Sequence, residues 1–228
     1  MASRPERGYE VGPLNGKPPM TAASTEIRHI VFDIGNVLIS WEPERLYRRL
    51  IPDEAARRVF LAEVLTHEWN LEQDRGRSWA DAEAEVLARY PQHAELIRAW
   101  RLHWHEMVPG AIEETVEILR ALIASGYDVT ALTNFAEDTF AEAQARFPYL
   151  TTFRGITVSG KVRLVKPDVA IYHHHVEAHD LDPAATLFFD DMPANIEAAR
   201  AAGWNAERFV DPATMRADLE KWGVRLTA

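Results

Sequence analysis

The spacing of apolar positions changes along the chain, and each spacing predicts a different kind of element. A β-branched and aromatic run at residues 27–33, "IRHIVFD", predicts a short buried strand. From residue 43 to residue 107, apolar residues recur every three or four positions, in "PERLYRRLI", "DEAARRVFLAEVL", "WADAEAEVLARY" and "HAELIRAWRLHWHEM". That spacing puts apolar side chains on one face of a helix, so this segment is predicted to be a block of helices.

Beyond residue 108, helix-like and strand-like patterns alternate. Helical spacing at residues 112–125, 137–146, 168–179 and 194–202 alternates with strand-like runs at residues 127–133, 155–159, 186–190 and 206–210. Two of these helices end directly before a glycine, Gly126 or Gly203, which is a common way to end a helix. The alternation predicts right-handed βαβ units and a parallel sheet with helices on both faces.

The helical block interrupts this alternation after its first strand and therefore has the position of an insertion. We predict an α/β protein with a Rossmann-like parallel sheet core, formed by residues 26–42 and 109–228. The small helical cap inserted after the first strand comprises residues 43–108. Residues 1–25 are rich in proline, glycine and polar side chains, so they are expected to be a flexible tail.

Composition and charge narrow the class of protein. The chain has 228 residues, of which 47% are apolar and 26% charged, as in ordinary globular domains. Its net charge is −10 without a basic cluster, so a nucleic-acid partner is not expected. An apolar run of about 18 residues, as a membrane span needs, is missing from the sequence. Cysteine is also missing, which excludes thiolate chemistry and suits a reducing cytoplasm, where we expect the protein to act.

Reactive side chains follow four predicted strands where each strand ends. In chain order these are Asp33, then Thr133 and Asn134, then Lys166, then Asp190 and Asp191, with Asn195 four residues after Asp191. Each alone has an ordinary explanation as a helix cap or turn residue. Ligands of open parallel sheets bind at the carboxyl ends of the strands, so the set is expected to converge. Together it supplies a nucleophile, a hydroxyl, a cation and a carboxylate pair, which covalent catalysis on an anionic group requires.

The segments "FDIGNVL", "LTN", "KPDVAIY" and "FFDDMPANIEAA" resemble the four motifs of the haloacid dehalogenase-like hydrolases, across about residues 27–210. The resemblance implies that Asp33 is the nucleophile, that Thr133 hydrogen-bonds the phosphoryl group and that Lys166 neutralises charge. It also implies a Mg²⁺ site made by Asp33, the backbone carbonyl of Gly35, Asp190 and Asp191, with Asn195 orienting the acidic loop. Asn36 and Asn134 are the substrate contacts expected in the core.

The family contains phosphatases and dehalogenases, and the fourth motif distinguishes them. Dehalogenases typically carry Ser-Ser-Asn where this chain has Asp190 and Asp191. Two carboxylates near Asp33 would repel each other, and a carboxylate substrate, unless a cation bridged them. We therefore predict a Mg²⁺-dependent phosphomonoesterase for a small phosphorylated metabolite, with a sugar phosphate favoured. The alternatives are a 2-haloacid dehalogenase and a non-catalytic member that binds a phosphorylated ligand or a protein.

Gly35 departs from the family pattern. Most phosphatases of the family carry an acid at this position, which protonates the leaving group and then activates water. The pattern Asp-x-Gly-Asn-Val resembles a bacterial subgroup that includes α-D-glucose-1-phosphate phosphatase, whose substrate has a comparatively good leaving group. A cap residue is a second way to supply the acid, and His67, Glu72 and Asp74 are the candidates.

The helical cap is expected to select the substrate. The stretch "EWNLEQDRGRSW" brings Trp69, Gln73 and Arg75 together, so that a sugar could stack on the indole and hydrogen-bond to the other two. The ordinary alternative is a helix end whose tryptophan packs inward. Five of the seven tryptophans lie between Trp41 and Trp104, and this tryptophan-rich segment is also a candidate homodimer face.

Overall fold

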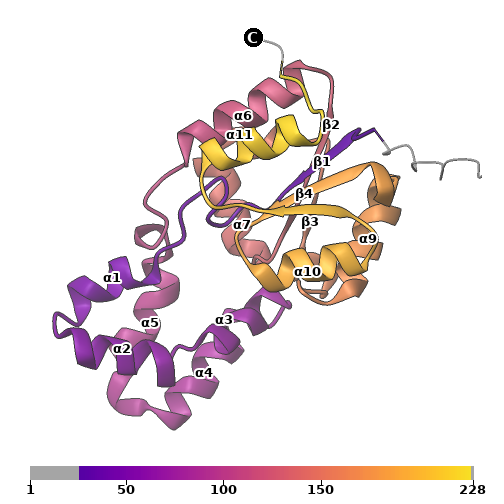
Figure 1. Cartoon of the computed structure of the whole chain (residues 1–228). Helices are drawn as coiled ribbons and strands as arrows, with labels where there is room; N and C mark the ends of the chain where they lie inside the picture. The colour runs from indigo at the N-terminus through magenta and orange to yellow at the C-terminus, as the bar shows by residue number, and fades with distance from the viewer. Residues whose placement is uncertain (1–25, 227–228) are drawn as a thin grey trace, which may run out of the picture.

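A parallel sheet forms the centre of the protein. The computed structural model describes residues 26–226, so the predicted flexible tail, residues 1–25, lies outside the described residues. The strands are β1 (His29–Phe32), β2 (Asp128–Thr133), β3 (Gly155–Val158), β4 (Thr186–Asp190) and β5 (Asn205–Arg208). They form a five-stranded sheet in the order β3-β2-β1-β4-β5, with every neighbouring pair parallel (Figure 1). The predicted α/β class with a Rossmann-like parallel sheet is confirmed.

Helices cover both faces of the sheet because alternate side chains of each strand enter different apolar cores. On one face lie α6 (Glu113–Ala124) and α11 (Pro212–Lys221), and on the other α9 (Val169–His179) and α10 (Pro193–Ala201) (Figure 1). Ile30 and Phe32 of β1 belong to the first core, whereas Val31 between them belongs to the second. The sheet is therefore buried on both sides, and its functional groups are confined to the strand ends.

Between β1 and β2 the chain forms a separate group of helices, residues 43–106, which we call the helical lobe (Figure 1). Its helices are α1 (Pro43–Leu50), α2 (Glu54–Glu63), α3 (His67–Asp74), α4 (Trp79–Arg89) and α5 (Ala94–Leu102). Aromatic side chains form its core, with ring centroids of Trp69 and Trp100 5.5 Å apart and those of Tyr47 and Phe60 5.2 Å apart. These large apolar faces give a small helical unit enough burial to hold its shape.

Two further helices and several short turns complete the described structure. α7 (Glu137–Arg146) follows β2, and α8 (Ser159–Val162) follows β3. Short 3₁₀ turns lie at Pro91–His93, Trp104–Glu106, Pro148–Thr151 and Pro183–Ala185. Within residues 26–226, every helix is too short or too polar to cross a membrane.

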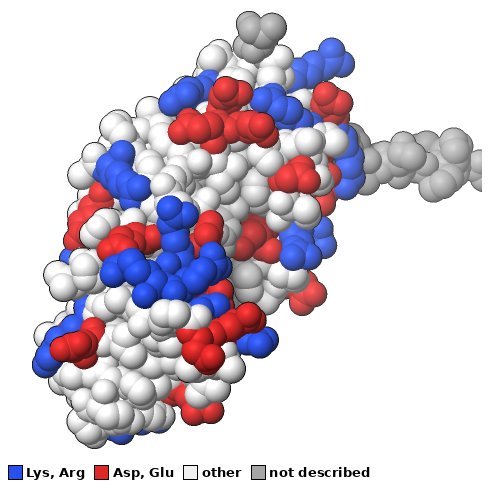
Figure 2. Space-filling view, turned by 90° about the vertical axis from the view of Figure 1, so that its left-hand side faces the viewer, with Lys and Arg blue, Asp and Glu red and all other residues white. Residues whose placement is uncertain are grey.

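The helical lobe is held against the strand ends by polar contacts. Trp79 donates from Nε1 to Asp138 of α7 at 2.9 Å, and Arg101 of α5 pairs with Asp138 and with Glu142. Arg146 donates to the carbonyl oxygen of Val108, in the linker that returns to the sheet, at 2.7 Å. Figure 2 shows acidic side chains beside basic ones over one face of the molecule, in keeping with these ion pairs.

Candidate active site

Three carboxylates converge where β1 and β4 end. Asp33 directly follows β1, Asp190 is the last residue of β4, and Asp191 follows it. Because β1 and β4 are neighbours and run parallel, their carboxyl ends lie side by side. One oxygen of each carboxylate lies within 4.8 Å of the others, and Asp33 and Asp190 are only 7% and 0% exposed. The three negative charges are thus close together and largely withdrawn from water.

Lys166 lies between two of these carboxylates. Its Nζ is 2.9 Å from Oδ1 of Asp33 and 2.6 Å from Oδ2 of Asp190, and it donates to the carbonyl oxygen of Leu132 at 3.0 Å. Burial by itself lowers the pKa of Lys166, but the charges of Asp190 and Asp33 outweigh burial and the pKa is raised. Lys166 therefore stays cationic and offsets part of the carboxylate charge.

The pKa values of Asp33 and Asp191 are raised, because both groups are partly removed from water and lie close to the negative charge of Asp190. Burial raises the pKa of Asp33 to about 7, with Lys166 lowering it and Asp190 raising it. Burial, followed by the charge of Asp190, also raises the pKa of Asp191. A cation among these oxygens would relieve the repulsion, and carboxylate oxygens are the donors that Mg²⁺ prefers. The residues present therefore fit a magnesium ion.

Asparagine side chains hold this charged cluster in place. Asn195 on α10 donates from Nδ2 to both oxygens of Asp190, at 2.9 and 3.0 Å, and Asn36 donates to Oδ2 of Asp191 at 3.2 Å. Asn134 exchanges two hydrogen bonds with the backbone of Lys166, at 2.8 and 2.9 Å. Asn36 adopts a φ of 54°, in the left-handed region that asparagine tolerates better than most residues.

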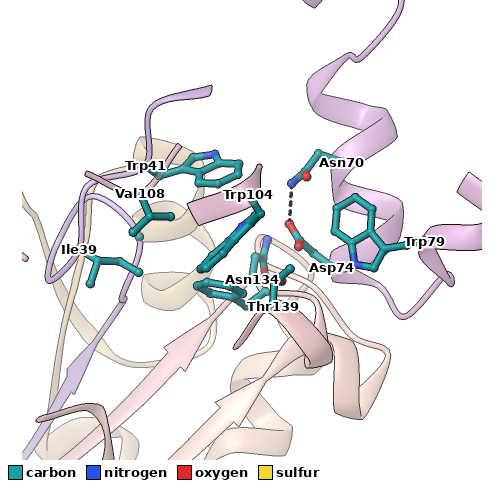
Figure 3. A pocket seen from close by; sticks show the side chains of 11 residues that line it. Ile39, Trp41, Asn70, Asp74, Trp79, Trp104, Val108, Asn134 and Thr139 are labelled. Carbon is teal, nitrogen blue, oxygen red and sulfur yellow. Dashed lines mark hydrogen bonds between the residues drawn. The ribbon is translucent and has the colours of Figure 1, made fainter. Parts of the chain in front are cut away.

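A cavity lies between these strand ends and the helical lobe (Figure 3). Its walls are mainly apolar, with Trp41, Trp79 and Trp104 as the largest side chains. Its polar lining consists of Asn70, Asp74, Asn134 and Thr139, and the remaining lining residues are Gly35, Ile39, Val108 and Phe135. The cavity can thus bring the organic part of a ligand next to the turn that follows Asp33.

The structure brings only some of the predicted site residues together. Asp33, Lys166, Asp190, Asp191 and Asn195 form one connected cluster. Thr133 ends β2 and is 1% exposed, Gly35 and Asn134 line the cavity, and Asn36 contacts Asp191 rather than the cavity. The roles that the resemblance implies for these residues remain predictions.

The predicted substrate contacts on α3 need correction. Trp69 is 8% exposed and donates from Nε1 to the carbonyl oxygen of Ala82 at 3.2 Å, inside the helical lobe. Gln73 is 1% exposed and accepts from Nε of Arg77 at 2.7 Å. Arg75 is exposed and pairs with Glu72 on the surface. Trp69 and Gln73 lie away from the cavity lining because their face of α3 packs within the lobe, whereas Arg75 points to the surface.

The neighbouring face of α3 contributes Asn70 and Asp74 instead. Asn70 donates from Nδ2 to Oδ2 of Asp74 at 3.2 Å, and both line the cavity (Figure 3). Their spacing of four residues puts them on one side of the helix, which is a pattern that the sequence does contain. Of the three predicted acids in the cap, His67 and Glu72 are exposed outside the cavity lining, and only Asp74 belongs to it.

The chain resembles known proteins over most of its length. A family model described as haloacid dehalogenase-like hydrolase matches residues 27–203. The chain is 26% identical over 191 residues to the sesquiterpene phosphatase astK of Aspergillus oryzae, and the match covers 78% of this chain and 88% of that protein. The similarity thus extends over most of both proteins rather than over one motif.

Solved structures share the fold at lower identity. A HAD family enzyme of Bacteroides thetaiotaomicron, in complex with magnesium and inorganic phosphate, has a TM-score of 0.63 and 20% identity, covering 81% of this chain and 95% of that one. The L-2-haloacid dehalogenase of Xanthobacter autotrophicus, with chloropropionic acid covalently bound, has a TM-score of 0.59 and 16% identity, covering 87% and 84%. From the family match and the converging strand-end residues, we conclude that this chain belongs to the haloacid dehalogenase-like hydrolases.

Proposed function

We propose that this hydrolase is a Mg²⁺-dependent phosphomonoesterase that acts on a small phosphorylated metabolite. The observation that carries the proposal is the position of Lys166, buried between Asp33 and Asp190 with Asp191 beside them. This cluster would repel an anionic substrate on its own but would bind one once a divalent cation had joined it. The phosphatase relative from Aspergillus oryzae supports the choice of phosphate esters.

In the proposed reaction, a carboxylate oxygen of Asp33 attacks phosphorus and forms an aspartyl-phosphate. Lys166 holds Asp33 in position and offsets the charge that gathers during transfer. Thr133, at the end of the neighbouring strand β2, donates a hydrogen bond from its hydroxyl to a phosphoryl oxygen. Asp33, Asp190, Asp191 and the carbonyl oxygen of Gly35 would hold Mg²⁺, which would neutralise negative charge during the transfer.

The organic part of the substrate occupies the cavity in this proposal. A sugar phosphate remains the favoured class, because Trp41 and Trp104 offer flat apolar faces and Asn70 and Asn134 offer hydrogen-bonding groups. The same walls suit an apolar alcohol, and the phosphatase from Aspergillus oryzae is named for sesquiterpenes. Glucose 1-phosphate and an isoprenyl phosphate are therefore the two esters whose kcat/KM values should be compared first.

The testing experiment measures phosphate release from these and other small esters, with Mg²⁺ or with EDTA. We expect release to require Mg²⁺ and to be lost in Asp33→Asn, which keeps the size of the side chain but removes the nucleophile. Folding of Asp33→Asn is checked by its thermal unfolding. Phosphate release that persists in Asp33→Asn would contradict the proposed nucleophile.

The two alternative functions give different results in the same experiment. A 2-haloacid dehalogenase would release halide from a 2-haloacid in the presence of EDTA, since displacement at carbon needs no divalent cation. A non-catalytic protein would bind phosphate or Mg²⁺ without turnover of any ester. The cytoplasmic location, the absence of a nucleic-acid partner and the homodimer face remain predictions.

A further inference from the structure

The turn after Asp33 has no side chain that could exchange a proton with the substrate, because Gly35 occupies the cavity-facing position. A Cβ atom built on Gly35 would meet no other atom within 4 Å, so this position faces open space. The cavity beside the nucleophile therefore has room for an ester oxygen or a water molecule. A proton donor for that oxygen has to come from another part of the cavity wall.

We propose that Asp74, at the end of α3 in the helical lobe, is the general acid and base of the reaction. This inference rests on the proposed phosphatase function and adds the missing proton-transfer group. Among the cavity-lining residues, Asp74 is the one whose side chain is an acid, since the others are glycine, aliphatic, aromatic, amide or threonine residues. Figure 3 shows its carboxyl group between Asn70 of the helical lobe and Asn134 of the core.

Contacts to the core fix Asp74 near the strand ends. Ser159, the first residue of α8, donates from Oγ to the backbone carbonyl oxygen of Asp74 at 2.6 Å. The same Oγ accepts from the backbone N–H of Phe135, two residues after Thr133, at 2.9 Å. The backbone N–H of Ala136, in the same loop, lowers the pKa of the Asp74 carboxyl group. Asp74 is thus tied through its backbone to the loop that follows β2, although it belongs to the helical lobe.

The environment of Asp74 suits a group that must both give and take a proton. Burial raises the pKa of Asp74 to about 7, against the opposing effects of the Ala136 hydrogen bond and the charge of Lys166. A proton-transfer group works best when its pKa lies near the operating pH, because both protonation states are then populated. Glu72, on the same helix, is exposed and lies outside the cavity lining.

Asp74 gives up a proton in the first step of the reaction and takes one back in the second. While the bond between Asp33 and phosphorus forms and the ester P–O bond breaks, protonated Asp74 gives its proton to the departing ester oxygen, which leaves as the alcohol. Ionised Asp74 then takes a proton from water as the water oxygen bonds to phosphorus and the Asp33–phosphorus bond breaks. Inorganic phosphate leaves, and both aspartates return to their starting states. One residue can serve both steps because the leaving oxygen and the attacking water occupy the same side of phosphorus, opposite Asp33.

The test compares Asp74→Asn with wild type on an alkyl phosphate and on nitrophenyl phosphate, whose leaving group needs little protonation. We expect kcat/KM for the alkyl ester to fall by about 10²–10⁴-fold, the usual contribution of a positioned acid or base. For nitrophenyl phosphate we expect a rapid burst of about one nitrophenol per active site, followed by slow turnover, because water attack on the aspartyl-phosphate lacks its base. A structural role for Asp74 would not produce this burst.

Glu72→Gln is the matched control, since Glu72 lies on the same helix but outside the cavity lining, and it should retain wild-type rates on both esters. Gly35→Asp in the Asp74→Asn background is a rescue variant, because the open space at Gly35 admits a carboxyl group. Recovery of alkyl-ester hydrolysis would support the proposal. Failure of the rescue, together with an equal loss on both esters and no burst, would overturn it.

The experiment also separates this inference from the proposed function. If wild type hydrolyses phosphate esters and Asp74→Asn has unchanged kinetics on both, only the role of Asp74 is refuted. If wild type releases phosphate from no ester, the phosphatase proposal fails, and the role of Asp74 fails with it. A thermal unfolding midpoint for Asp74→Asn at pH 4.5 close to that of wild type excludes misfolding, since neutral asparagine resembles the protonated form of Asp74 that prevails at that pH.

Discussion

At the scale of single residues, the ammonium group of Lys166 controls the charge balance of the site. Replacing Lys166 with methionine removes the partner of Asp33 and Asp190 and leaves two buried carboxylates facing each other. We expect the free energy of unfolding at pH 8 in EDTA to fall by about 3–5 kcal/mol, as when one partner of a buried ion pair is removed. Urea denaturation measures this change, and phosphate release should be lost as well.

Added Mg²⁺ should restore part of the lost stability of Lys166→Met, because the cation replaces some of the missing positive charge. Lys161→Met is the control, since Lys161 is exposed on α8 and its loss should change the free energy of unfolding by less than about 0.5 kcal/mol. Equal stability of Lys166→Met and Lys161→Met would show that Asp33 and Asp190 do not depend on this ammonium group.

A second residue-scale prediction concerns the pH dependence of stability. The pKa of Asp74 is raised from 3.8 to about 7, so the folded protein holds this proton more tightly than the unfolded chain. The stability that this group contributes is full below about pH 4 and is lost as the pH rises through 7. Asparagine does not titrate, so Asp74→Asn does not lose this stability as the pH rises. The thermal unfolding midpoint of the variant should therefore rise relative to that of wild type between pH 4.5 and pH 8.

Thermal unfolding in EDTA at these two pH values tests the prediction. Asp33 also has a raised pKa, but it is present in both proteins, and its effect cancels in the difference between their midpoints. A difference that stays constant from pH 4.5 to pH 8 would mean that Asp74 titrates in the folded protein as it does in the unfolded chain.

At the scale of elements, α3 is fixed at both ends. Thr66 caps its first turn by accepting from the backbone N–H of Trp69 at 3.0 Å, and Ser159 holds its last residue, Asp74. Ser159→Ala removes the latter bond and leaves the N–H of Phe135 without its partner. We expect the free energy of unfolding to fall by about 1–3 kcal/mol and kcat to fall more than KM changes, because Asp74 loses its position.

Asp53→Ala is a control that lowers the stability of the protein without affecting the position of Asp74. Asp53 caps α2 by accepting from the backbone N–H of Ala56 at 2.8 Å, far along the chain from Asp74. Its loss should lower the free energy of unfolding by about 1 kcal/mol and leave kcat unchanged. If Ser159→Ala, measured by urea denaturation and steady-state kinetics, behaves like Asp53→Ala, Ser159 is only a stabilising residue.

The sequence predicted most elements because their apolar patterns are long and regular. Helix α11 is missing from the predicted set, since only Met215 and Leu219 of its ten residues are buried. Met215 and Leu219 are the two large apolar residues of this segment, and two such positions make a weak helical pattern. On α3 the sequence pattern predicted too much rather than too little. The indole of Trp69 suggested a ligand contact, but it lies inside the helical lobe.

At the scale of the whole molecule, Mg²⁺ binding should couple the strand ends to global stability. A ligand that binds only the folded state at one hundred times its Kd adds about 2.7 kcal/mol to the free energy of unfolding. We therefore expect Mg²⁺ to raise the thermal unfolding midpoint of wild type and to raise that of Asp191→Asn much less. Glu54→Gln, an exposed substitution on α2, should keep the full effect. An equal rise in all three proteins would argue against the acidic cluster as the binding site.

The strand-end cluster could be predicted because topology alone brings it together. Parallel strands end at one edge of the sheet, so Asp33, Thr133 and Asp190 meet there whatever the rest of the chain does. The cavity could not be predicted in the same way. Which face of α3 reaches the strand ends depends on how the helical lobe packs against α7 and α8, through contacts such as that of Trp79 with Asp138.

The tryptophans around the cavity make the intrinsic fluorescence of the protein a probe of this region. Trp41, Trp79 and Trp104 line the cavity, Trp69 and Trp100 pack directly behind them, and Trp204 and Trp222 lie in the core around the sheet. Five of the seven indoles therefore lie at the cavity or directly behind it. Intrinsic fluorescence should consequently follow ligand entry and movement of the helical lobe in real time, without any attached label.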